Sequence, residues 1–236
     1  MVNPLRWLFR KLTLVVFNYI HTRLGVRRIN ILGRPFDVYP QVYNPGFSKL
    51  LNFPTTEHLA KYIVVKEGEK VLDMGTGIGV QAVIAALKGG DVVATDIFPT
   101  AIDCTIHNAK LNLVDSKIDV RQGDLFKPIA GESFDLIIWL APSFFSSPAH
   151  PYQSGWMCGA NGEVLHRFCD EVDNYLNTGG RILFSCVDRN RTFILEHLKC
   201  NKFHCKLIAP PKKRFPLETI TIYEARRSKD KTNHII

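Results

Sequence analysis

Strand-like and helix-like segments alternate along this chain from Thr55 almost to its end. Strands separated by helices cannot pair through tight turns, so they run parallel in one sheet with helices on both faces. The expected strands are 70–74, 91–96, 117–124, 134–140 and 181–187, and the expected helices are 55–64, 80–88, 99–112, 162–176 and 189–199. The sequence therefore predicts an α/β fold with a mainly parallel sheet.

Glycines and the final segments complete this pattern. The pairs Gly89-Gly90 and Gly179-Gly180 are expected to end two of the helices. Residues 203–209 and 217–225 read as two strands with no helix between them. We therefore expect an antiparallel pair at the end of the chain, joined by the loop PPKKRF.

The ends of the chain differ from its middle. Residues 5–20 carry apolar side chains at helical spacing and predict an amphipathic helix, whose apolar face packs on the domain, on a partner or on a membrane surface. Residues 29–54 are strand-like and turn-rich, with four prolines that forbid a long helix. We expect an N-terminal extension over 1–54, a main domain over 55–226 and a disordered tail over 227–236.

Composition sets broad limits on location and partners. The net charge is +8, and basic residues concentrate at both ends, which suits RNA, an acidic protein or an anionic lipid surface. No apolar run has membrane-spanning length, and no signal peptide is recognisable, so a cytoplasmic protein is expected. The six cysteines form no CxxC pair. His197, Cys200, His204 and Cys205 straddle an expected helix end and strand, so no metal site is expected.

The stretch VLDMGTGIGV, residues 71–80, follows an expected strand and opens an expected helix. A dinucleotide fingerprint needs a third glycine at position 80, where this chain has Val80. A Walker loop needs Gly-Lys-Ser/Thr, which is absent. The loop therefore predicts close backbone approach to a ligand of another kind.

Three acidic residues lie at the ends of successive strands, at the same edge of the sheet. Asp73 precedes the glycine loop, where a carboxylate repels pyrophosphate and suits a ligand with an amino group. Asp96 ends the next strand, where it can accept hydrogen bonds from ribose hydroxyls. Asp124 follows the third strand, where it can accept an adenine amino proton. Together they predict a nucleoside ligand that also carries an amino group.

These residues resemble the class I S-adenosylmethionine-dependent methyltransferases, and more narrowly the archaeal and eukaryotic HemK-related glutamine methyltransferases of release factors. The motifs are VYNPGFSKLL, VLDMGTGIGV, ATDIFPTAIDCTIHNAKLN, GDLFKPIAGESFDLII, GANGEVLHRFCDEVDNYLNTGGRILF and KKRFPLETITIYEA. The resemblance implies a seven-stranded sheet with an antiparallel last strand and S-adenosyl-L-methionine as cofactor. It places the cofactor on Asp73, Gly75, Thr76, Gly77, Gly79, Asp96, Ile97, Asp124, Leu125 and Leu140.

One motif departs from that family. Its fourth strand is followed by Asn-Pro-Pro-Tyr, in which the asparagine oxygen and a backbone carbonyl accept the amide protons of the substrate glutamine. This chain has Leu140-Ala141-Pro142-Ser143, or Ala141-Pro142-Ser143-Phe144 in a register slipped by one residue. Ser48 and Lys49 also stand where the family tends to carry Asp-Thr. We therefore expect a changed methyl acceptor in a retained cofactor site.

The acceptor pocket is expected to be apolar and aromatic. Trp139, Phe144 and Phe145 are its expected walls, and the loop 146–161 is its expected lid. His150, Tyr152 and Tyr43 are candidates for a proton acceptor or an orienting group. The candidate catalytic residues are Ala141, Pro142, Ser143, Phe144 and Tyr43.

The sequence thus predicts a methyltransferase acting on a small molecule or another non-glutamine acceptor. A protein methyltransferase acting on glutamine or another side chain, or an RNA N-methyltransferase, is the alternative. A catalytically silent binding module is a further alternative, although such a protein has no need of the intact glycine loop and Asp96. A dehydrogenase is disfavoured by Val80 and Asp73.

Overall fold

The computed structural model describes residues 25–45, 55–214 and 218–228. The expected helix over 5–20, the residues Ser48 and Lys49 and most of the expected tail lie outside these ranges. Within the described residues, no helix is both long enough and apolar enough to cross a membrane.

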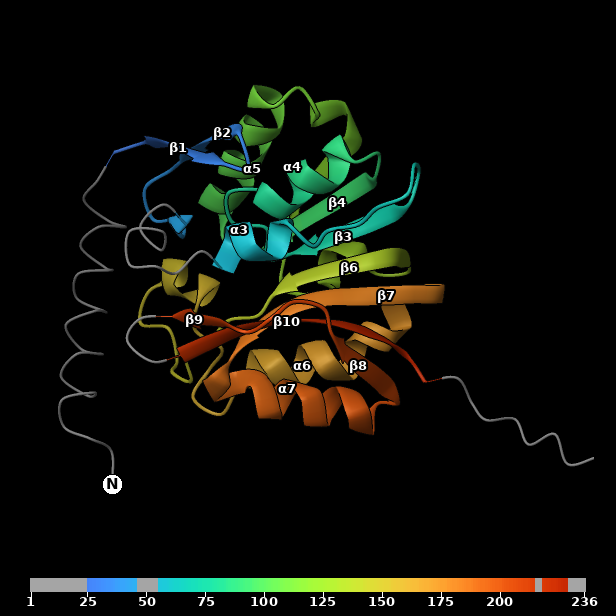
Figure 1. The fold of residues 1–236 in the computed structure, drawn as a ribbon. Helices are drawn as coiled ribbons and strands as arrows, with labels where there is room; N and C mark the ends of the chain where they lie inside the picture. Colours follow the sequence, from blue (N-terminus) through green and yellow to red (C-terminus); the bar gives the residue numbers. More distant parts are fainter. Residues whose placement is uncertain (1–24, 46–54, 215–217, 229–236) are drawn as a thin grey trace, which may run out of the picture.

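A single mixed sheet forms the centre of the molecule (Figure 1). Its strands are β3 (Lys70–Met74), β4 (Asp91–Asp96), β5 (Ile118–Gln122), β6 (Phe134–Leu140), β7 (Leu176–Val187), β8 (Phe203–Leu207) and β10 (Glu218–Arg227). The order across the sheet is β5-β4-β3-β6-β7-β10-β8, and the first five of these strands are parallel. This confirms the predicted mainly parallel sheet.

The last strand runs antiparallel to its neighbours, as predicted. β10 runs antiparallel to β7 on one side and to β8 on the other. The loop expected between the final strands contains a short strand, β9 (Lys212–Arg214), which also pairs with β10.

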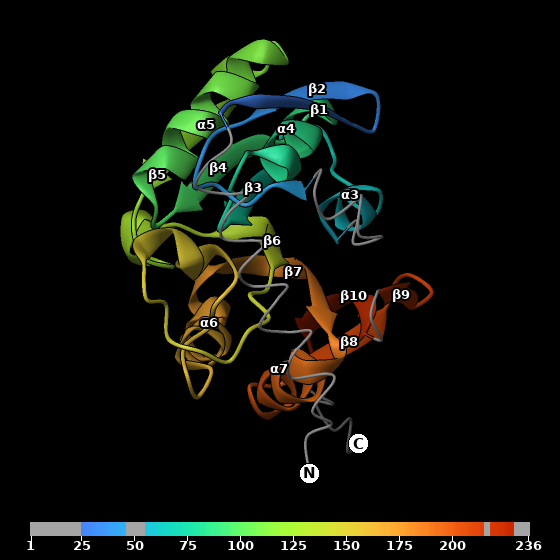
Figure 2. The same cartoon turned by 90° about the vertical axis from the view of Figure 1, so that its left-hand side faces the viewer.

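Helices cover both faces of the sheet, as Figures 1 and 2 show. The longer ones are α3 (Thr55–Ala60), α4 (Val80–Leu87) and α5 (Pro99–Leu111) on one face, and α6 (Glu163–Glu171) and α7 (Asp188–Cys200) on the other. Alternate residues of β6 enter the two cores, because side chains of a strand point to opposite faces. Leu136 and Ile138 pack with the first group, and Ile137 and Trp139 pack with the second. Single 3-10 turns lie at Asp115–Lys117, Lys127–Ile129, Pro151–Gly155 and Val172–Tyr175.

An antiparallel hairpin precedes the main sheet. It consists of β1 (Arg27–Ile31) and β2 (Arg34–Val38), and it packs on α5. The backbone N–H of Asp37 donates to Asn108 Oδ1 at 2.8 Å, and Asn112 Nδ2 donates to the carbonyl of Pro35 at 2.9 Å. Buried amide side chains of α5 therefore hold the hairpin against the domain.

The expectation that Gly179-Gly180 ends a helix is wrong. α6 ends at Glu171, and both glycines lie inside β7. The register between β6 and β7 shifts there, since Phe134 pairs with Leu176 while Leu136 pairs with Arg181. A Cβ on Gly180 would come within 3.0 Å of the Phe134 carbonyl oxygen, so glycine permits the close approach of the two strands.

Candidate active site

The glycine loop lies between β3 and α4, at the edge where the parallel strands end. The backbone N–H groups of Gly75 and Thr76 both donate to the carbonyl of Thr95 at 2.9 Å. Gly77 has φ +59°, and a Cβ built on it would meet no atom within 4 Å. Its backbone therefore borders open space, which is the cradle that a ligand of the expected kind requires.

Asp73 is buried beneath this loop, with 2 % of its surface exposed. Its Oδ2 accepts hydrogen bonds from Thr76 Oγ1 at 2.7 Å and from the Ala82 backbone N–H at 3.0 Å. Burial raises the pKa of Asp73 to about 7, against the effect of these two hydrogen bonds. Asp73 therefore organises the loop and satisfies a donor in the first turn of α4, besides lining the cleft.

Asp96 holds the next position along the sheet edge. Its Oδ2 accepts from the Gly77 N–H at 3.0 Å and its Oδ1 from the Phe98 N–H at 2.9 Å. Burial raises the pKa of this carboxyl group. Each carboxylate oxygen has a second lone pair, so Asp96 retains capacity to accept hydrogen bonds from a ribose.

Asp124 borders the same cleft beyond β5 and contacts two cations. Arg167 donates to both of its oxygens, at 3.2 and 2.9 Å, and Lys127 Nζ lies 3.2 Å from Oδ2. Burial favours a higher pKa for Asp124, but these hydrogen bonds hold it below its usual value. An adenine amino group at this position has to share the carboxylate with Arg167.

Two residues of α5 that the sequence analysis missed support the loop from below. Thr105 Oγ1 donates to the carbonyl of Gly77 at 3.1 Å, and Asn108 Nδ2 donates to that of Ile78 at 2.9 Å. Both side chains are fully buried. Their spacing could have identified them, because positions 105, 108 and 112 lie on one face of the helix, and polar residues on a buried face usually have a hydrogen-bonding role.

Most of the predicted cofactor residues meet at one cleft. The residues that line it include Asp73, Gly75, Thr76, Gly77, Asp96, Ile97, Asp124, Leu125 and Leu140. Gly79 lies under the loop, where a Cβ would come within 3.0 Å of Thr105 Cγ2. Gln41 and Leu125 also line the cleft and have positive φ angles of 67° and 49°, a strained backbone typical of functional sites.

The predicted catalytic residues separate into two groups. Tyr43 and Pro142 line the cleft, whereas Ala141, Ser143 and Phe144 lie outside its lining. The guanidinium carbon of Arg189 lies 4.5 Å from the centre of the Phe144 ring. Phe145 contacts Phe193 of α7, with ring centres 6.1 Å apart.

Backbone pairing explains why Phe144 lies outside the cleft. The N–H groups of Ser143 and Phe144 donate to the carbonyl of Trp156 at 3.1 and 2.9 Å, and the Cys158 N–H donates to the carbonyl of Phe144 at 2.9 Å. Trp139 does line the cleft, as expected, but it is only 3 % exposed and stacks on Phe168 with 3.7 Å between ring centres, so most of its ring belongs to the core.

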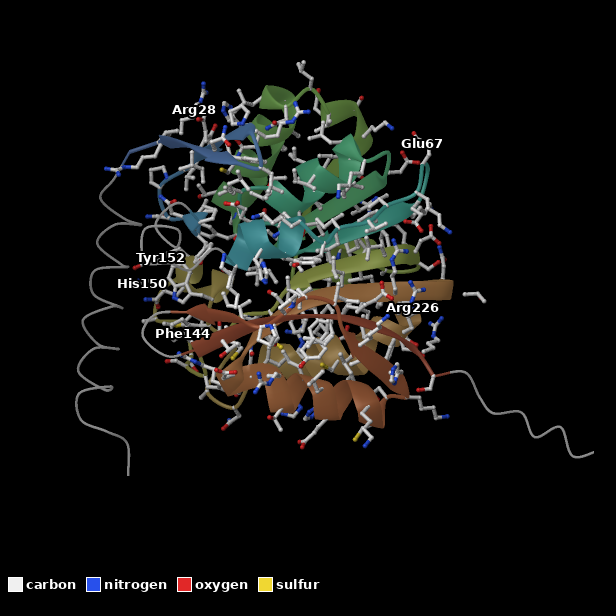
Figure 3. The ribbon with its side chains drawn as sticks, viewed as in Figure 1. Arg28, Glu67, Phe144, His150, Tyr152 and Arg226 are labelled. Carbon is white, nitrogen blue, oxygen red and sulfur yellow. The ribbon has the colours of Figure 1, made fainter. Side chains whose placement is uncertain are left out.

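The loop 146–161 contributes one aromatic side chain, Tyr152, to the lining of the cleft, and other aromatic rings of the loop pack around it. The Tyr152 ring stacks on that of His150, with 5.4 Å between ring centres, and its centre lies 6.0 Å from that of the Trp156 ring. The ring centres of Trp156 and Tyr43 are 6.4 Å apart. Figure 3 shows Phe144, His150 and Tyr152 on one side of the molecule, opposite Glu67 and Arg226.

A buried amide fixes the segment after β6. Asn190 lies in the first turn of α7 with no exposed surface. Its Oδ1 accepts from the Val187 N–H, and its Nδ2 donates to the Pro142 carbonyl, both at 2.9 Å. The sequence analysis missed this residue, because nothing in the local pattern links α7 to Pro142.

The cysteine and histidine cluster is dispersed. No group of three or more metal-ligating side chains is close enough to hold an ion among the described residues. His197 stacks on Phe193 at 4.2 Å, and Cys200 is exposed.

Comparison with known proteins identifies the family. The family model for ribosomal protein L11 methyltransferase matches residues 53–140. A putative protein N5-glutamine methyltransferase, MJ0928 of Methanocaldococcus jannaschii, is 31% identical over 207 residues, covering 84% of this chain and 98% of the relative. The chain belongs to the class I S-adenosylmethionine-dependent methyltransferases. It is therefore a methyltransferase that uses S-adenosyl-L-methionine as its methyl donor.

Other relatives extend this identification. The ribosomal protein L11 methyltransferase of Lactobacillus johnsonii is 31% identical over 62% of this chain, which spans only 45% of that relative. A ribosomal protein L11 methylase structure from Lactobacillus delbrueckii subsp. bulgaricus has a TM-score of 0.57 at 22% identity, over 81% of this chain and 84% of that one. The structure of the tRNA m1G37 methyltransferase of M. jannaschii has a TM-score of 0.63 at 19% identity, and the match covers 88% of this chain and 58% of that one. These two structures share the fold.

Proposed function

We propose that this methyltransferase acts on a protein, and that its acceptor is an amine nitrogen rather than the side-chain amide of glutamine. The protein substrate is supported by the relatives, which are named for ribosomal protein L11 and for protein glutamine. These comparisons give no support to the small-molecule acceptor expected from the sequence, and they favour the macromolecular alternative.

The observation that carries the proposal is that no asparagine directly follows β6 in the described segment. In the HemK-related arrangement, an asparagine oxygen and a backbone carbonyl after the fourth strand receive the two amide protons. Neither register, 140–143 or 141–144, supplies an asparagine oxygen for the first amide proton. The Pro142 carbonyl accepts from Asn190, so only one of its two lone pairs remains for a substrate. Asn190 itself has both ends of its amide engaged.

An amine nitrogen requires fewer orienting and polarising hydrogen bonds than an amide nitrogen to attack the methyl group. The lone pair of an amide nitrogen is delocalised, so an amide acceptor depends on hydrogen bonds that orient and polarise it. A deprotonated amine has an available lone pair, and methyl transfer then requires alignment and removal of water. Tyr43 and Tyr152 line the acceptor end of the cleft, and their ring faces attract the positive charge that develops on the nitrogen as the methyl group is transferred.

The cofactor supplies an electrophilic methyl group on a sulfonium sulfur. We assign the ribose to Asp96, the adenine to the segment around Asp124 and Leu125, and the methionine part to the glycine loop above Asp73. Leu140 and Pro142 form an apolar floor between these groups and the acceptor. Excluding water there keeps the amine unprotonated and close to the methyl group.

Labelled cofactor and acid hydrolysis distinguish the candidate acceptors. The purified protein is incubated with a cell extract and methyl-tritiated S-adenosylmethionine, and the protein fraction is hydrolysed in strong acid. An N-methylated amine survives as a labelled amino acid, whereas N5-methylglutamine releases labelled methylamine because its amide bond is cleaved. The proposal predicts labelled methylamino acid and is overturned if methylamine dominates.

Two further arms test the other acceptors. Label that ribonuclease removes would identify RNA, and label confined to the low-molecular-mass fraction would identify a small molecule. Glutamine is the second candidate, since the relative covering most of this chain is named for that activity. The Asp96→Ala variant is the control for cofactor-dependent transfer.

A further inference from the structure

Gln81 is a buried side chain of the cleft with one unsatisfied end. It lies in the first turn of α4, has 4 % of its surface exposed and lines the cleft. Its Nε2 donates to the carbonyl of Thr56 at 3.3 Å, and this bond fixes which end of the amide is oxygen. Its Oε1 has no hydrogen-bond partner within the described part of the chain.

A buried carbonyl oxygen without a donor is unfavourable, and because Gln81 lines the cleft, a ligand bound there can supply the donor. Asp73 also lines the cleft, and its Oδ2 accepts a hydrogen bond from the backbone N–H of Ala82, the residue next to Gln81. Because Gln81 and Asp73 both line the cleft, a ligand bound there meets an amide oxygen and a carboxyl group. That pair suits a positively charged N–H donor.

The position of Gln81 identifies which part of the cofactor supplies this donor. The acids assigned to adenine and ribose follow β5 and β4, on one side of β3. Gln81 instead bonds to Thr56 of α3, and α3 contacts β6 and β7 on the other side of β3. Of the donors that S-adenosylmethionine carries, only the methionine ammonium belongs at this end of the cleft.

We propose that Gln81 is a specificity-determining residue that accepts a hydrogen bond from the methionine ammonium group of the cofactor. The inference rests on the use of S-adenosylmethionine and not on the identity of the acceptor. Gln81 thereby selects ligands that carry the amino acid part and discriminates against nucleosides that lack it.

The test compares two ligands in calorimetry, in the absence of any acceptor. S-adenosylhomocysteine carries the ammonium group, whereas 5′-methylthioadenosine shares the adenine, ribose and thioether but lacks the amino acid part. Gln81→Met keeps the length of the side chain and removes the oxygen. It should weaken S-adenosylhomocysteine binding roughly tenfold, as expected for one hydrogen bond to a charged group, and leave 5′-methylthioadenosine binding unchanged.

The second ligand also reports whether the variant folds. Asp96→Ala is the matched control, and it should weaken both ligands because both contain the ribose. Equal losses for both ligands in Gln81→Met would overturn the proposal by assigning Gln81 a structural role. Unchanged affinity for both would overturn it by showing that the oxygen has no part in binding. Neither result bears on the amine acceptor, which these measurements leave out.

Discussion

Asn108 donates a hydrogen bond from its side-chain Nδ2 to the backbone carbonyl of Ile78, at 2.9 Å, in the centre of the glycine loop. The same amide donates to the carbonyl of Asp37 and accepts from its N–H, both at 2.8 Å. One fully buried side chain therefore joins the cofactor loop to the N-terminal hairpin. The hairpin is thus part of the support of the cofactor site.

Asn108→Ala is expected to destabilise the protein and to weaken cofactor binding together. The substitution leaves the Ile78 carbonyl and the Asp37 N–H without this partner, whereas the Asp37 carbonyl keeps a hydrogen bond from Cys104 Sγ at 3.2 Å. With a cost of ~1–3 kcal/mol for each buried group left unpaired, we expect a loss of about 3 kcal/mol in the free energy of unfolding after partial rehydration. Urea denaturation measures this loss. The exposed Asn161→Ala provides the comparison, and a loss below about 1 kcal/mol for Asn108→Ala would contradict the structural role.

Asp73 predicts an unusual dependence of stability on pH. Its pKa is about 7 in the folded protein against an ordinary value of 3.8, so the folded state binds one more proton than the unfolded state between these values. The contribution of Asp73 to the free energy of unfolding is therefore greatest at low pH and falls as pH rises from 3.8 toward about 7. Asp73→Asn cannot ionise and should lack this component. Thermal melts of both proteins across this window measure the difference, and parallel pH profiles would rule the effect out.

Asp37 gives the opposite dependence at lower pH. Hydrogen bonding to Arg28, assisted by His107, lowers the pKa of this carboxyl group to about 2 from 3.8, although burial opposes the shift. The stabilisation is present above pH 3.8 and is lost as pH falls through about 2. Asp37→Asn should therefore lower the melting temperature at pH 6 but have little effect at pH 2. An equal decrease at both pH values would show that packing, not charge, is responsible.

Tyr152 is expected to act through its ring. Tyr152→Ala removes a wall of the acceptor end and should raise the KM for the acceptor about tenfold, while the affinity for S-adenosylhomocysteine stays the same. Tyr152→Phe keeps the ring and should retain a KM close to that of the native enzyme. If the phenylalanine variant loses activity as severely as the alanine variant, the hydroxyl group is the functional element.

Sequence patterns were sufficient to predict the sheet and the gathering of the three acids at one cleft along its edge. The strands after Lys70 are compact apolar runs, and the acids at 73, 96 and 124 end or follow three of them, so topology alone brings them to one edge. These features are local in sequence, and parallel pairing converts them into a site.

The acceptor end was less predictable because distant segments determine it. Phe144 and Phe145 are apolar residues next to the cofactor strand, but pairing with residues 156–159 places them against α7. The bond from Asn190 to Pro142 joins residues 48 positions apart. Gly179-Gly180 has the composition of a helix end, yet the register shift against β6 uses it within a strand.

The most direct measurement of the central proposal is methyl transfer to a release factor that carries a Gly-Gly-Gln motif. The native enzyme, saturated with S-adenosylmethionine, is incubated with this factor, and the glutamine-containing peptide is examined by mass spectrometry. Because no asparagine directly follows β6 in the described segment to accept an amide proton, we predict no mass increase on that glutamine. Robust addition of 14 Da to the glutamine, the mass of one methylene group, would contradict it and assign the enzyme to the glutamine methyltransferases.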